Sequence, residues 1–179
     1  MHTFTKIIVA LSLASFAAGS IGCAAPEENV SNGSINPDGT ARTEVCKATD
    51  QTEIASLFDR WNDSLQTGDA DAVVANYAER SILLPTVSNT PRLTPTEKRD
   101  YFEKEFLPKA PSGRIDQRFI QIGCNSAVDA GLYTFTLGKT GEQVSARYSY
   151  TYSWDGSKWL ITSHHSSAMP ETTGATATR

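Results

Sequence analysis

The chain has 179 residues, with 16 Lys or Arg against 20 Asp or Glu, for a formal net charge of −4. This acidic balance argues against nucleic acid and against anionic lipid surfaces as partners, because both carry negative charge themselves. It does not identify a partner.

The first 22 residues have the pattern of a secretory signal peptide. Lys6 provides a basic start, and the apolar stretch over 7–18 is too short for a permanent transmembrane helix. The run from Ser20 to Cys23 resembles a bacterial lipobox, although Ser20 stands where these motifs usually carry Leu. Two outcomes stay open: lipidation of Cys23, which gives a membrane-anchored lipoprotein, or ordinary cleavage nearby, which gives a free periplasmic or secreted protein. Both predict export.

The cysteine count is consistent with lipidation. Three cysteines are an odd number for an exported protein. If Cys23 carries lipid, Cys46 and Cys124 remain as a pair in an oxidising compartment, where we expect a disulfide between them. Such a bond closes a long loop of the unfolded chain and adds about 4 kcal/mol on the chain-entropy account. The alternative is two buried free thiols.

The composition changes along the mature chain. Residues 23–45 are rich in Asn, Ser, Gly, Pro and Thr and poor in apolar side chains, which predicts a flexible tether. Residues 171–179 form a similar polar tail. The folded part is therefore expected to be one domain over 46–170.

Two helices are expected at the start of this domain. Apolar side chains at helical spacing predict a helix over 51–67, with an apolar face of Ile54, Leu57, Phe58, Trp61 and Leu65. Gly68 ends this helix. Asp69 can then cap a second, shorter helix that carries Val73, Val74 and Tyr77.

A short strand and a third helix follow. The stretch 81–85 predicts a strand that stops at its proline. Thr94, Pro95 and Glu97 combine a cap, a first-turn proline and a capping box. Together they predict a helix from 94 to about 107.

After Gly113 the pattern changes to a period of two. Stretches rich in β-branched and aromatic residues predict strands over 114–122, 131–137, 143–154 and 158–167. A turn at Asp155-Gly156 makes a hairpin of the last two. Helices first and antiparallel strands after predict an α+β domain, in which a curved sheet packs against the helices and leaves a cleft for a small ligand.

The last strand carries the most distinctive polar run, His164-His165-Ser166-Ser167. Strict alternation places Trp159, Ile161, Ser163, His165 and Ser167 on one face, and Leu160, Thr162, His164 and Ser166 on the other. Only one of the two histidines then faces the cleft, with His164 on the face of Ser166 and His165 on the face of Ser167, unless a bulge breaks the alternation. A hydrogen-bonded structural histidine is the ordinary alternative for either one.

The histidine count bears on metal binding. The chain has three histidines, and His2 leaves with the signal peptide. A three-His zinc site is then impossible within one mature chain, and oxidised Cys46 and Cys124 would be poor ligands. A built-in metal is disfavoured, although a site of one His with carboxylates stays open.

Hydroxyl groups follow the proline that ends the first strand. Thr86 and Ser88 can hold an oxyanion by hydrogen bonds at a cleft mouth, and Arg92 can pair with an anion. Tyr101 can point its hydroxyl into the cleft. Each has an ordinary alternative: turn chemistry, a surface ion pair or core packing.

In chain order, several stretches resemble those of the iota-class carbonic anhydrases: Leu57-Phe58-Asp59-Arg60-Trp61-Asn62, Leu83-Leu84-Pro85-Thr86-Val87-Ser88-Asn89, Pro91-Arg92, Asp100-Tyr101-Phe102, Gly131-Leu132-Tyr133-Thr134-Phe135, Ala146-Arg147-Tyr148, His164-His165-Ser166-Ser167 and Met169-Pro170. That family's domain is similar to the calmodulin-kinase association domain and to the wider nuclear-transport-factor-2-like superfamily. The resemblance runs from about Thr49 to Glu171.

The resemblance implies a cone of helices on a curved antiparallel sheet, commonly dimeric, and reversible hydration of carbon dioxide to bicarbonate. Family members are described both as metal-free and as dependent on manganese or zinc; the histidine count favours the metal-free form here. The family's bicarbonate pocket corresponds to Thr86, Tyr101 and Ser166, with His164 or His165 close by. A neutral histidine that titrates near physiological pH would take the proton.

Two rival functions remain. This fold hosts many functions, so the domain can be a non-enzymatic ligand-binding or oligomerisation module. It can also be an isomerase or dehydratase for a larger ligand, which would need a carboxylate in the cleft. Asp59, Asp63 and Asp100 all fall in helix-surface patterns and do not supply one.

Overall fold

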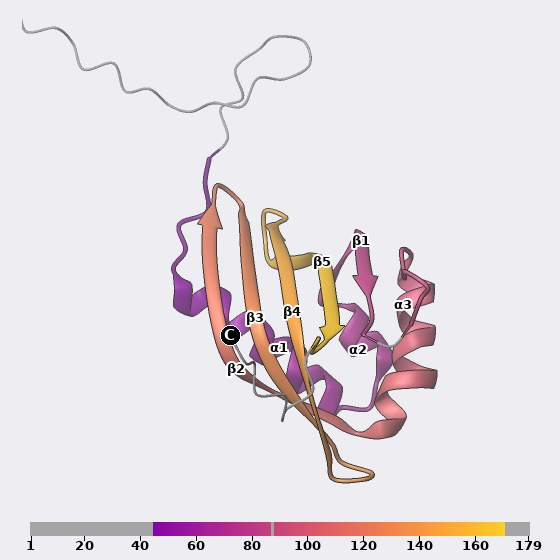
Figure 1. Ribbon diagram of the computed structural model, residues 1–179. Coiled ribbons are helices and arrows are strands. Elements are labelled where there is room, and N and C mark those ends of the chain that lie inside the picture. The colour runs from indigo at the N-terminus through magenta and orange to yellow at the C-terminus, as the bar shows by residue number, and fades with distance from the viewer. Residues whose placement is uncertain (1–44, 87, 171–179) are drawn as a thin grey trace, which may run out of the picture. The chain divides into compact units, whose positions relative to one another are not determined.

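The computed structural model describes residues 45–86 and 88–170 (Figure 1). The expected signal peptide over 1–22, the lipidation site Cys23, the tether up to residue 44 and the tail over 171–179 lie outside the described residues. No helix in the described ranges is long and apolar enough to cross a membrane.

The first two helices form where the apolar spacing predicts them. Helix α1 (Gln51–Gln66) buries the predicted apolar face and is followed by Gly68 at φ +68, a left-handed conformation that glycine adopts without strain. The Asp69 side chain accepts the Asp71 N–H and caps α2 (Ala70–Val74). The sequence analysis placed Tyr77 in this helix, but the structure places it at the start of strand β1 (Tyr77–Leu84). The strand therefore starts earlier than predicted.

Helix α3 (Pro95–Tyr101) begins with the predicted capping box. Thr94 and Glu97 exchange side-chain-to-backbone hydrogen bonds at its first turn, with Pro95 between them. The helical path continues as a π-helical turn, Phe102–Phe106, and a 3₁₀ turn, Leu107–Lys109. The widened turn carries Phe106, which lines the cavity described below.

The sheet has five strands in the order β1-β5-β4-β3-β2. Its long members are β2 (Pro111–Gly123), β3 (Ser126–Leu137), β4 (Glu142–Trp154) and β5 (Trp159–Ala168). These four pair antiparallel, as predicted. The expectation of a wholly antiparallel sheet is wrong, because β1 pairs parallel with β5. Parallel neighbours need a long crossover, and here α3 and three strands separate the two in sequence.

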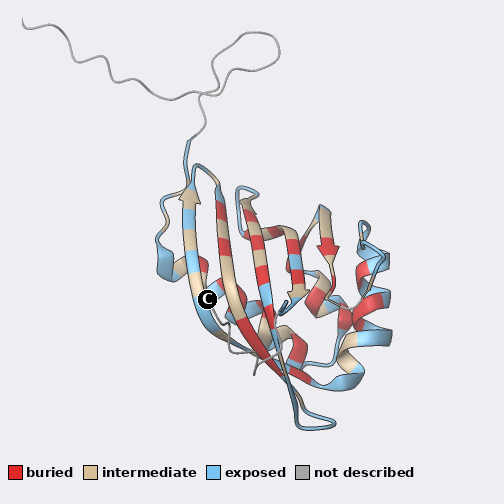
Figure 2. Cartoon of the chain, in the orientation of Figure 1, coloured by how far each residue is buried: buried red, intermediate tan, exposed pale blue. Residues whose placement is uncertain are grey.

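The core lies between α1 and one face of the sheet. Figure 1 shows α1 crossing behind the strands and α3 beside β1, and Figure 2 shows buried bands alternating along β3 and β4. The inward side chains of β4 include Tyr148, Tyr150 and Tyr152, which are all buried in the core. We call the face towards α1 the inner face and the opposite one the outer face.

A disulfide joins Cys46 to Cys124, as predicted. It ties the segment before α1 to the turn between β2 and β3. Next to it, the Lys47 N–H donates to the Asn125 side-chain oxygen at 2.8 Å, and the Asn125 amide donates to the Val45 carbonyl at 3.0 Å. The start of the domain is therefore fixed to the sheet by one covalent bond and two hydrogen bonds.

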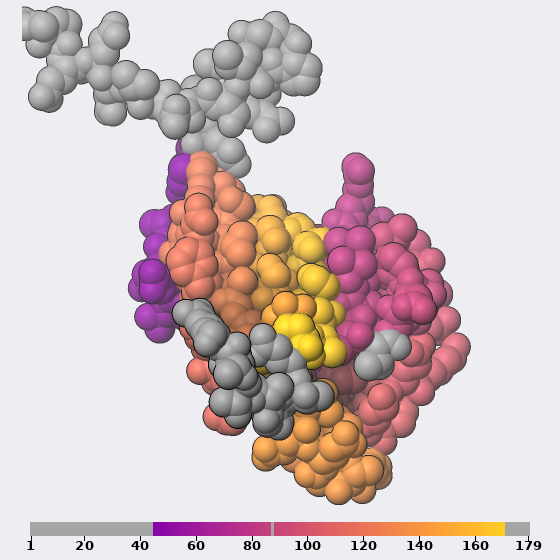
Figure 3. Space-filling model, viewed as in Figure 1, coloured from indigo at the N-terminus to yellow at the C-terminus, as the bar shows by residue number. Residues whose placement is uncertain are grey.

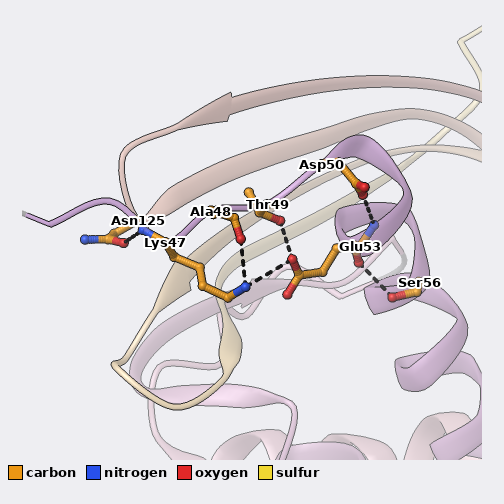
Figure 4. Close-up of polar contacts among 7 residues, drawn as sticks. All are labelled: Lys47, Ala48, Thr49, Asp50, Glu53, Ser56 and Asn125. Atoms are coloured by element: carbon orange, nitrogen blue, oxygen red, sulfur yellow. Dashed lines mark hydrogen bonds and ion pairs between the residues drawn. The ribbon is translucent and has the colours of Figure 1, made fainter.

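The same segment is also tied to the first turn of α1 (Figure 4). The Thr49 hydroxyl donates to a Glu53 carboxylate oxygen at 2.7 Å, and the Lys47 ammonium lies 3.4 Å from that oxygen. Asp50 caps the helix by accepting the Glu53 N–H. The contact with the Thr49 hydroxyl lowers the pKa of Glu53 most, followed by the charge of Lys47.

Candidate functional site

A cavity of about 120 Å³ lies between the helices and the inner face of the sheet. It is lined by Trp61, Leu83, Pro85, Thr86, Tyr101, Phe102, Phe106, Lys109, Tyr133, Phe135, Leu137, Val144, Ala146, His164 and Ser166. Most of these side chains are apolar, and the few hydroxyls are brought together from separate elements. Pockets for drug-sized ligands hold roughly 300 to 1,000 Å³, so this cavity suits a very small molecule.

Three hydroxyls form a chain at the polar end of the cavity. The Tyr133 hydroxyl, from β3, donates to the Ser166 Oγ at 2.5 Å. The Ser166 Oγ also hydrogen-bonds the Thr86 Oγ1, which follows β1. The sequence analysis predicted Thr86 and Ser166 but not Tyr133, because alternation along β3 shows only that Tyr133 faces inward.

The chain of hydroxyls leaves one O–H free for a ligand. Three hydroxyls carry three hydrogens, and the two internal hydrogen bonds use two of them. If Ser166 donates to Thr86, the free hydrogen is on Thr86; if Thr86 donates, it is on Ser166. Either way the chain offers one donor and several oxygen lone pairs to a ligand.

A β-bulge places Ser166 and His164 on the inner face. Pairing between β4 and β5 shifts between Thr151 and Tyr152, so that Ile161 and Ser163 pair with consecutive residues of β4 and Thr162 is left over. Trp159 and Ile161 are buried before the bulge, whereas His164 and Ser166 are buried after it. The strict alternation predicted for this strand is therefore wrong, because the extra residue reverses the phase.

His164 is a buried, neutral side chain. Its Nδ1 lies 2.8 Å from the Tyr77 hydroxyl, and its ring stacks on Tyr150 with centroids 4.1 Å apart. Burial lowers its pKa to about 3, with a smaller contribution from His165. The expectation of a cavity histidine that titrates near physiological pH is therefore wrong for His164.

His165 and Ser167 lie on the outer face, away from the cavity. His165 is exposed, and the Ser167 hydroxyl accepts a hydrogen bond from Arg147 Nε at 3.2 Å. Neither residue lines the cavity. The structure does not bring these two predicted site residues to the cavity, because the bulge places His164 and Ser166 on the inner face instead.

Tyr101 lines the cavity as predicted, but Ser88 and Arg92 do not. The Arg92 guanidinium donates to the Ser88 hydroxyl at 3.2 Å and to Glu105 at 3.0 Å, and it lies 5.7 Å from the centre of the Tyr101 ring. These two residues therefore hold the loop after β1 against the helix behind Tyr101. Burial, with a smaller contribution from Glu105 and against the effect of Arg92, raises the pKa of Tyr101 to about 12.

The loop that carries Thr86 is closed at its base. Leu83 and Arg92 exchange two backbone hydrogen bonds, of 3.0 and 2.9 Å. Thr86 is thereby held close to Ser166 although 80 positions separate them in sequence. The polar end of the cavity is thus built by the parallel pairing of β1 with β5 and by this closed loop.

The residues that line the cavity do not fit a zinc or manganese site. Such sites need three or more nitrogen, sulfur or carboxylate ligands, and the lining supplies one imidazole and no carboxylate or thiolate. Within 45–86 and 88–170, no three His, Cys, Asp or Glu side chains gather closely enough to hold a metal ion.

The sequence analysis missed one buried carboxylate. Asp129 on β3 is fully buried; it accepts from the Tyr148 hydroxyl at 2.8 Å and pairs with Arg118 at 3.2 Å. Desolvation raises its pKa, against the effect of Tyr148 and Arg118. Asp129 does not line the cavity. It therefore does not supply the base that an isomerase or dehydratase would need there.

Comparison with known proteins identifies the family of this domain. Residues 50–170 match the family described as calcium/calmodulin dependent protein kinase II association domain. A Xanthomonas campestris structure assigned to the same kind of domain is 45% identical, covers 74% of this chain and 100% of its own, and superimposes with a TM-score of 0.65. No curated protein matches the chain.

Two more distant structures show the same fold. An iota-carbonic anhydrase from a cyanobacterium, solved with bicarbonate, is 19% identical, covers 74% of this chain and 100% of its own, and gives a TM-score of 0.63. A nuclear-transport-factor-2-like protein with a cystatin-like fold from Novosphingobium aromaticivorans is 12% identical, covers 70% and 86%, and gives 0.59. The expected α+β fold of this superfamily is confirmed.

Proposed function

Since this chain belongs to the calcium/calmodulin dependent protein kinase II association domain family, we propose that it uses the cavity of that fold as a carbonic anhydrase. The reaction is the reversible hydration of carbon dioxide to bicarbonate and a proton. The distant likeness of this chain to a cyanobacterial iota-carbonic anhydrase supports the proposal.

The observation that carries the proposal is the match between the cavity and this substrate. Carbon dioxide is small and apolar, and the walls are formed by side chains such as Phe102, Phe106 and Phe135. Bicarbonate is a small oxyanion, and the hydroxyls of Thr86 and Ser166 meet at the polar end. One volume of about 120 Å³ thus offers a place for both forms of the substrate.

We propose the following division of roles. A water oxygen forms a bond to the carbon, one C=O electron pair moves onto its oxygen, and the free O–H of the hydroxyl chain stabilises the charge that develops there. As that bond forms, the water gives up one proton to a buffer base from solvent, which completes the conversion to bicarbonate and a proton. His164 does not act as the base, since its pKa is about 3.

The proposed reaction is metal-free, because the lining lacks a suitable donor set. Zinc would lower the pKa of a bound water to about 7. Without that effect, we expect slower turnover than in the zinc-dependent classes. The rival isomerase or dehydratase is disfavoured by the small volume and by the absence of a carboxylate from the lining.

The test is carbon dioxide hydration followed by stopped-flow with a pH indicator, before and after exhaustive chelation. We expect activity that survives chelation. Activity that vanishes on chelation and returns with manganese or zinc would contradict the metal-free part alone. No activity under any of these conditions would contradict the whole proposal and leave the binding or oligomerisation module.

We also propose a homodimer formed through the outer face of the sheet. The association-domain family suggests oligomerisation, and Figure 3 shows β2 to β5 side by side on one exposed face. Phe119 is 65% exposed there and pairs with Ala130 of β3. Sedimentation should show a dimer that Phe119→Asp weakens, whereas Leu93→Asp, at a similarly exposed residue, should not.

Export remains part of the proposal. The disulfide between Cys46 and Cys124 fits an oxidising compartment. Mass spectrometry of the mature N-terminus would distinguish a lipidated Cys23 from ordinary cleavage, and an uncleaved chain would contradict export by this route.

A further inference from the structure

Two buried polar side chains are in direct contact beside the cavity. Tyr77 opens β1 and His164 lies in β5, and the two strands pair in parallel. The Tyr77 hydroxyl is 2.8 Å from His164 Nδ1, and both residues are less than 10% exposed. His164 lines the cavity, but Tyr77 does not. The contact therefore acts on the cavity only through the imidazole.

We propose that Tyr77 holds His164 in the tautomer with its proton on Nε2, which makes the imidazole a hydrogen-bond donor to an oxyanion in the cavity. This inference rests on the proposed function for the identity of the anion. It makes Tyr77 a positioning residue, because it acts through His164.

The chemistry of the pair decides which group donates. A neutral imidazole has one nitrogen that donates and one that accepts, and the bond made by one nitrogen sets the role of the other. A phenol O–H is a stronger acid than a neutral imidazole N–H, and the bare imidazole nitrogen is the stronger acceptor. The favoured arrangement has the Tyr77 O–H donating to Nδ1, which leaves the proton on Nε2.

The Tyr77 hydroxyl keeps its proton and can therefore donate. Burial raises the pKa of Tyr77 well above its usual range, and the Trp61 indole N–H opposes that rise only in part. A phenol with a raised pKa stays protonated, so its O–H is available to Nδ1 of His164.

The other nitrogen of the ring, Nε2, is buried and has no hydrogen-bond partner in the part of the chain that the structure describes. A buried donor without a partner is costly, and a ligand oxygen in the cavity would remove that cost. Stacking on Tyr150 and the perpendicular Trp61 ring, with centroids 5.3 Å away, hold the plane of the imidazole.

With this tautomer, the cavity wall presents two hydrogen-bond donors to a ligand. The Nε2–H of His164 and the free O–H shared by Thr86 and Ser166 are neutral donors from neighbouring positions of the cavity wall. Two such donors match a small oxyanion such as bicarbonate. Because neither donor carries a charge, binding does not require a protonated histidine.

The tautomer is measured on the full chain by two-dimensional long-range ¹H–¹⁵N NMR. His2→Gln and His165→Gln variants assign the signals, because the chain has three histidines. We expect His164 to show a bare Nδ1 and a protonated Nε2. We also expect the Nε2 signal to move when sodium bicarbonate is added, and not with sodium chloride at equal ionic strength. A protonated Nδ1, or an Nε2 signal that bicarbonate leaves unmoved, would overturn the proposal.

Variants test the role of Tyr77. Tyr77→Phe should give a mixture of tautomers and weaken bicarbonate binding about fivefold to tenfold, the effect of one hydrogen bond. Tyr152→Phe is the matched control: Tyr152 is buried, its hydroxyl has no partner within the described ranges, and it does not line the cavity. Unchanged binding in folded Tyr77→Phe would overturn the proposal. If Tyr77→Phe fails to fold, the NMR measurement of the His164 tautomer in the wild-type protein tests the proposal on its own.

A conservative variant and the activity assay separate this inference from the proposed function. His164→Gln keeps an N–H donor near the Nε2 position and should bind bicarbonate better than His164→Leu; equal weakening would count against a donor role. A bicarbonate-dependent Nε2 shift without carbon dioxide hydration would contradict the anhydrase and support the donor. An active enzyme with its proton on Nδ1 would contradict only the donor.

Discussion

Ser166 connects the polar groups of the cavity, because its Oγ takes part in both hydrogen bonds of the hydroxyl chain. Removal of that oxygen breaks the chain between Thr86 and Tyr133. We expect Ser166→Ala to lower carbon dioxide hydration by about 100-fold, the loss typical of one preorganised donor to a developing oxyanion. Stopped-flow rates at saturating carbon dioxide measure the effect.

Ser167→Ala is the matched control for this prediction. Ser167 is the next residue along the strand, but its hydroxyl lies on the outer face and accepts from Arg147. Its removal should leave the rate within about twofold. Equal losses in both variants would mean that the strand, and not the hydroxyl chain, is what the substitutions disturb.

His164 should make the domain sensitive to acid. Its pKa is about 3 in the folded protein against an ordinary value of 6.5. Between these values the unfolded chain binds a proton that the folded protein does not. This stabilising contribution is therefore complete above pH 6.5 and is lost as the pH falls towards 3. The loss reaches about 5 kcal/mol, at about 1.4 kcal/mol for each pH unit.

Urea unfolding between pH 7 and pH 4 tests this dependence. The free energy of unfolding should fall more steeply with acid in the wild type than in His164→Gln, by about 2 kcal/mol between pH 7 and pH 5. His165→Gln, which removes the exposed imidazole of the outer face, serves as the comparison variant. Parallel slopes for wild type and His164→Gln would show that His164 is not held neutral.

The candidate site was predictable in its residue types but only in part in its geometry. Residue types and the family resemblance suggested Thr86, Tyr101 and Ser166, and the structure places all three at the cavity. Tyr133 was missed because every inward tyrosine of these strands has the same pattern, and only the register brings one to Ser166. The sequence analysis offered Arg92 as a partner for an anion at the cleft, but its guanidinium donates to Glu105 instead. That contact could not be predicted, because Glu105 lies on a different element.

At the scale of the elements, one bulge decides which half of the His-His-Ser-Ser run faces the cavity. Period-two patterns predicted the four long strands, because an alternating strand needs one buried face. A bulge leaves no comparable signal, since Thr162 is an ordinary strand residue. The parallel place of β1 was equally hidden, because pairing between distant strands depends on the path of the chain and not on local pattern.

The capping box of α3 offers a prediction at the same scale. Thr94 accepts the Glu97 N–H at 3.2 Å, and Glu97 accepts the Thr94 N–H at 2.9 Å. Thr94→Ala should lower the free energy of unfolding by about 1 kcal/mol, the usual cost of an N-cap. Thr96→Ala, exposed in the same first turn, should change it by less than about 0.5 kcal/mol. Equal effects in urea unfolding would contradict the capping role.

For the whole molecule, the order of secondary structure predicted the fold class because helices and sheet must bury their apolar faces against each other. Trp61 illustrates this: it is 1% exposed and packs against Phe102 of the helical layer and Tyr150 of the sheet. The cavity could be expected where such layers diverge. Its volume could not, because volume depends on how the rings of distant elements pack.

The disulfide between the start of the domain and the turn between β2 and β3 should account for a large share of the domain's stability. The disulfide between Cys46 and Cys124 spans 78 positions, so it removes many conformations from the unfolded chain. A double Cys46→Ser, Cys124→Ser variant should lose about 4 kcal/mol of unfolding free energy on the chain-entropy account. Urea unfolding with and without dithiothreitol measures the loss. Reductant should destabilise the wild type by a similar amount and leave the double variant unchanged.

Because the bond lies at the turn between β2 and β3, away from the residues that line the cavity, carbon dioxide hydration by the folded double variant should stay near the wild-type rate. A loss of activity without a loss of stability would mean that this end of the sheet shapes the cavity.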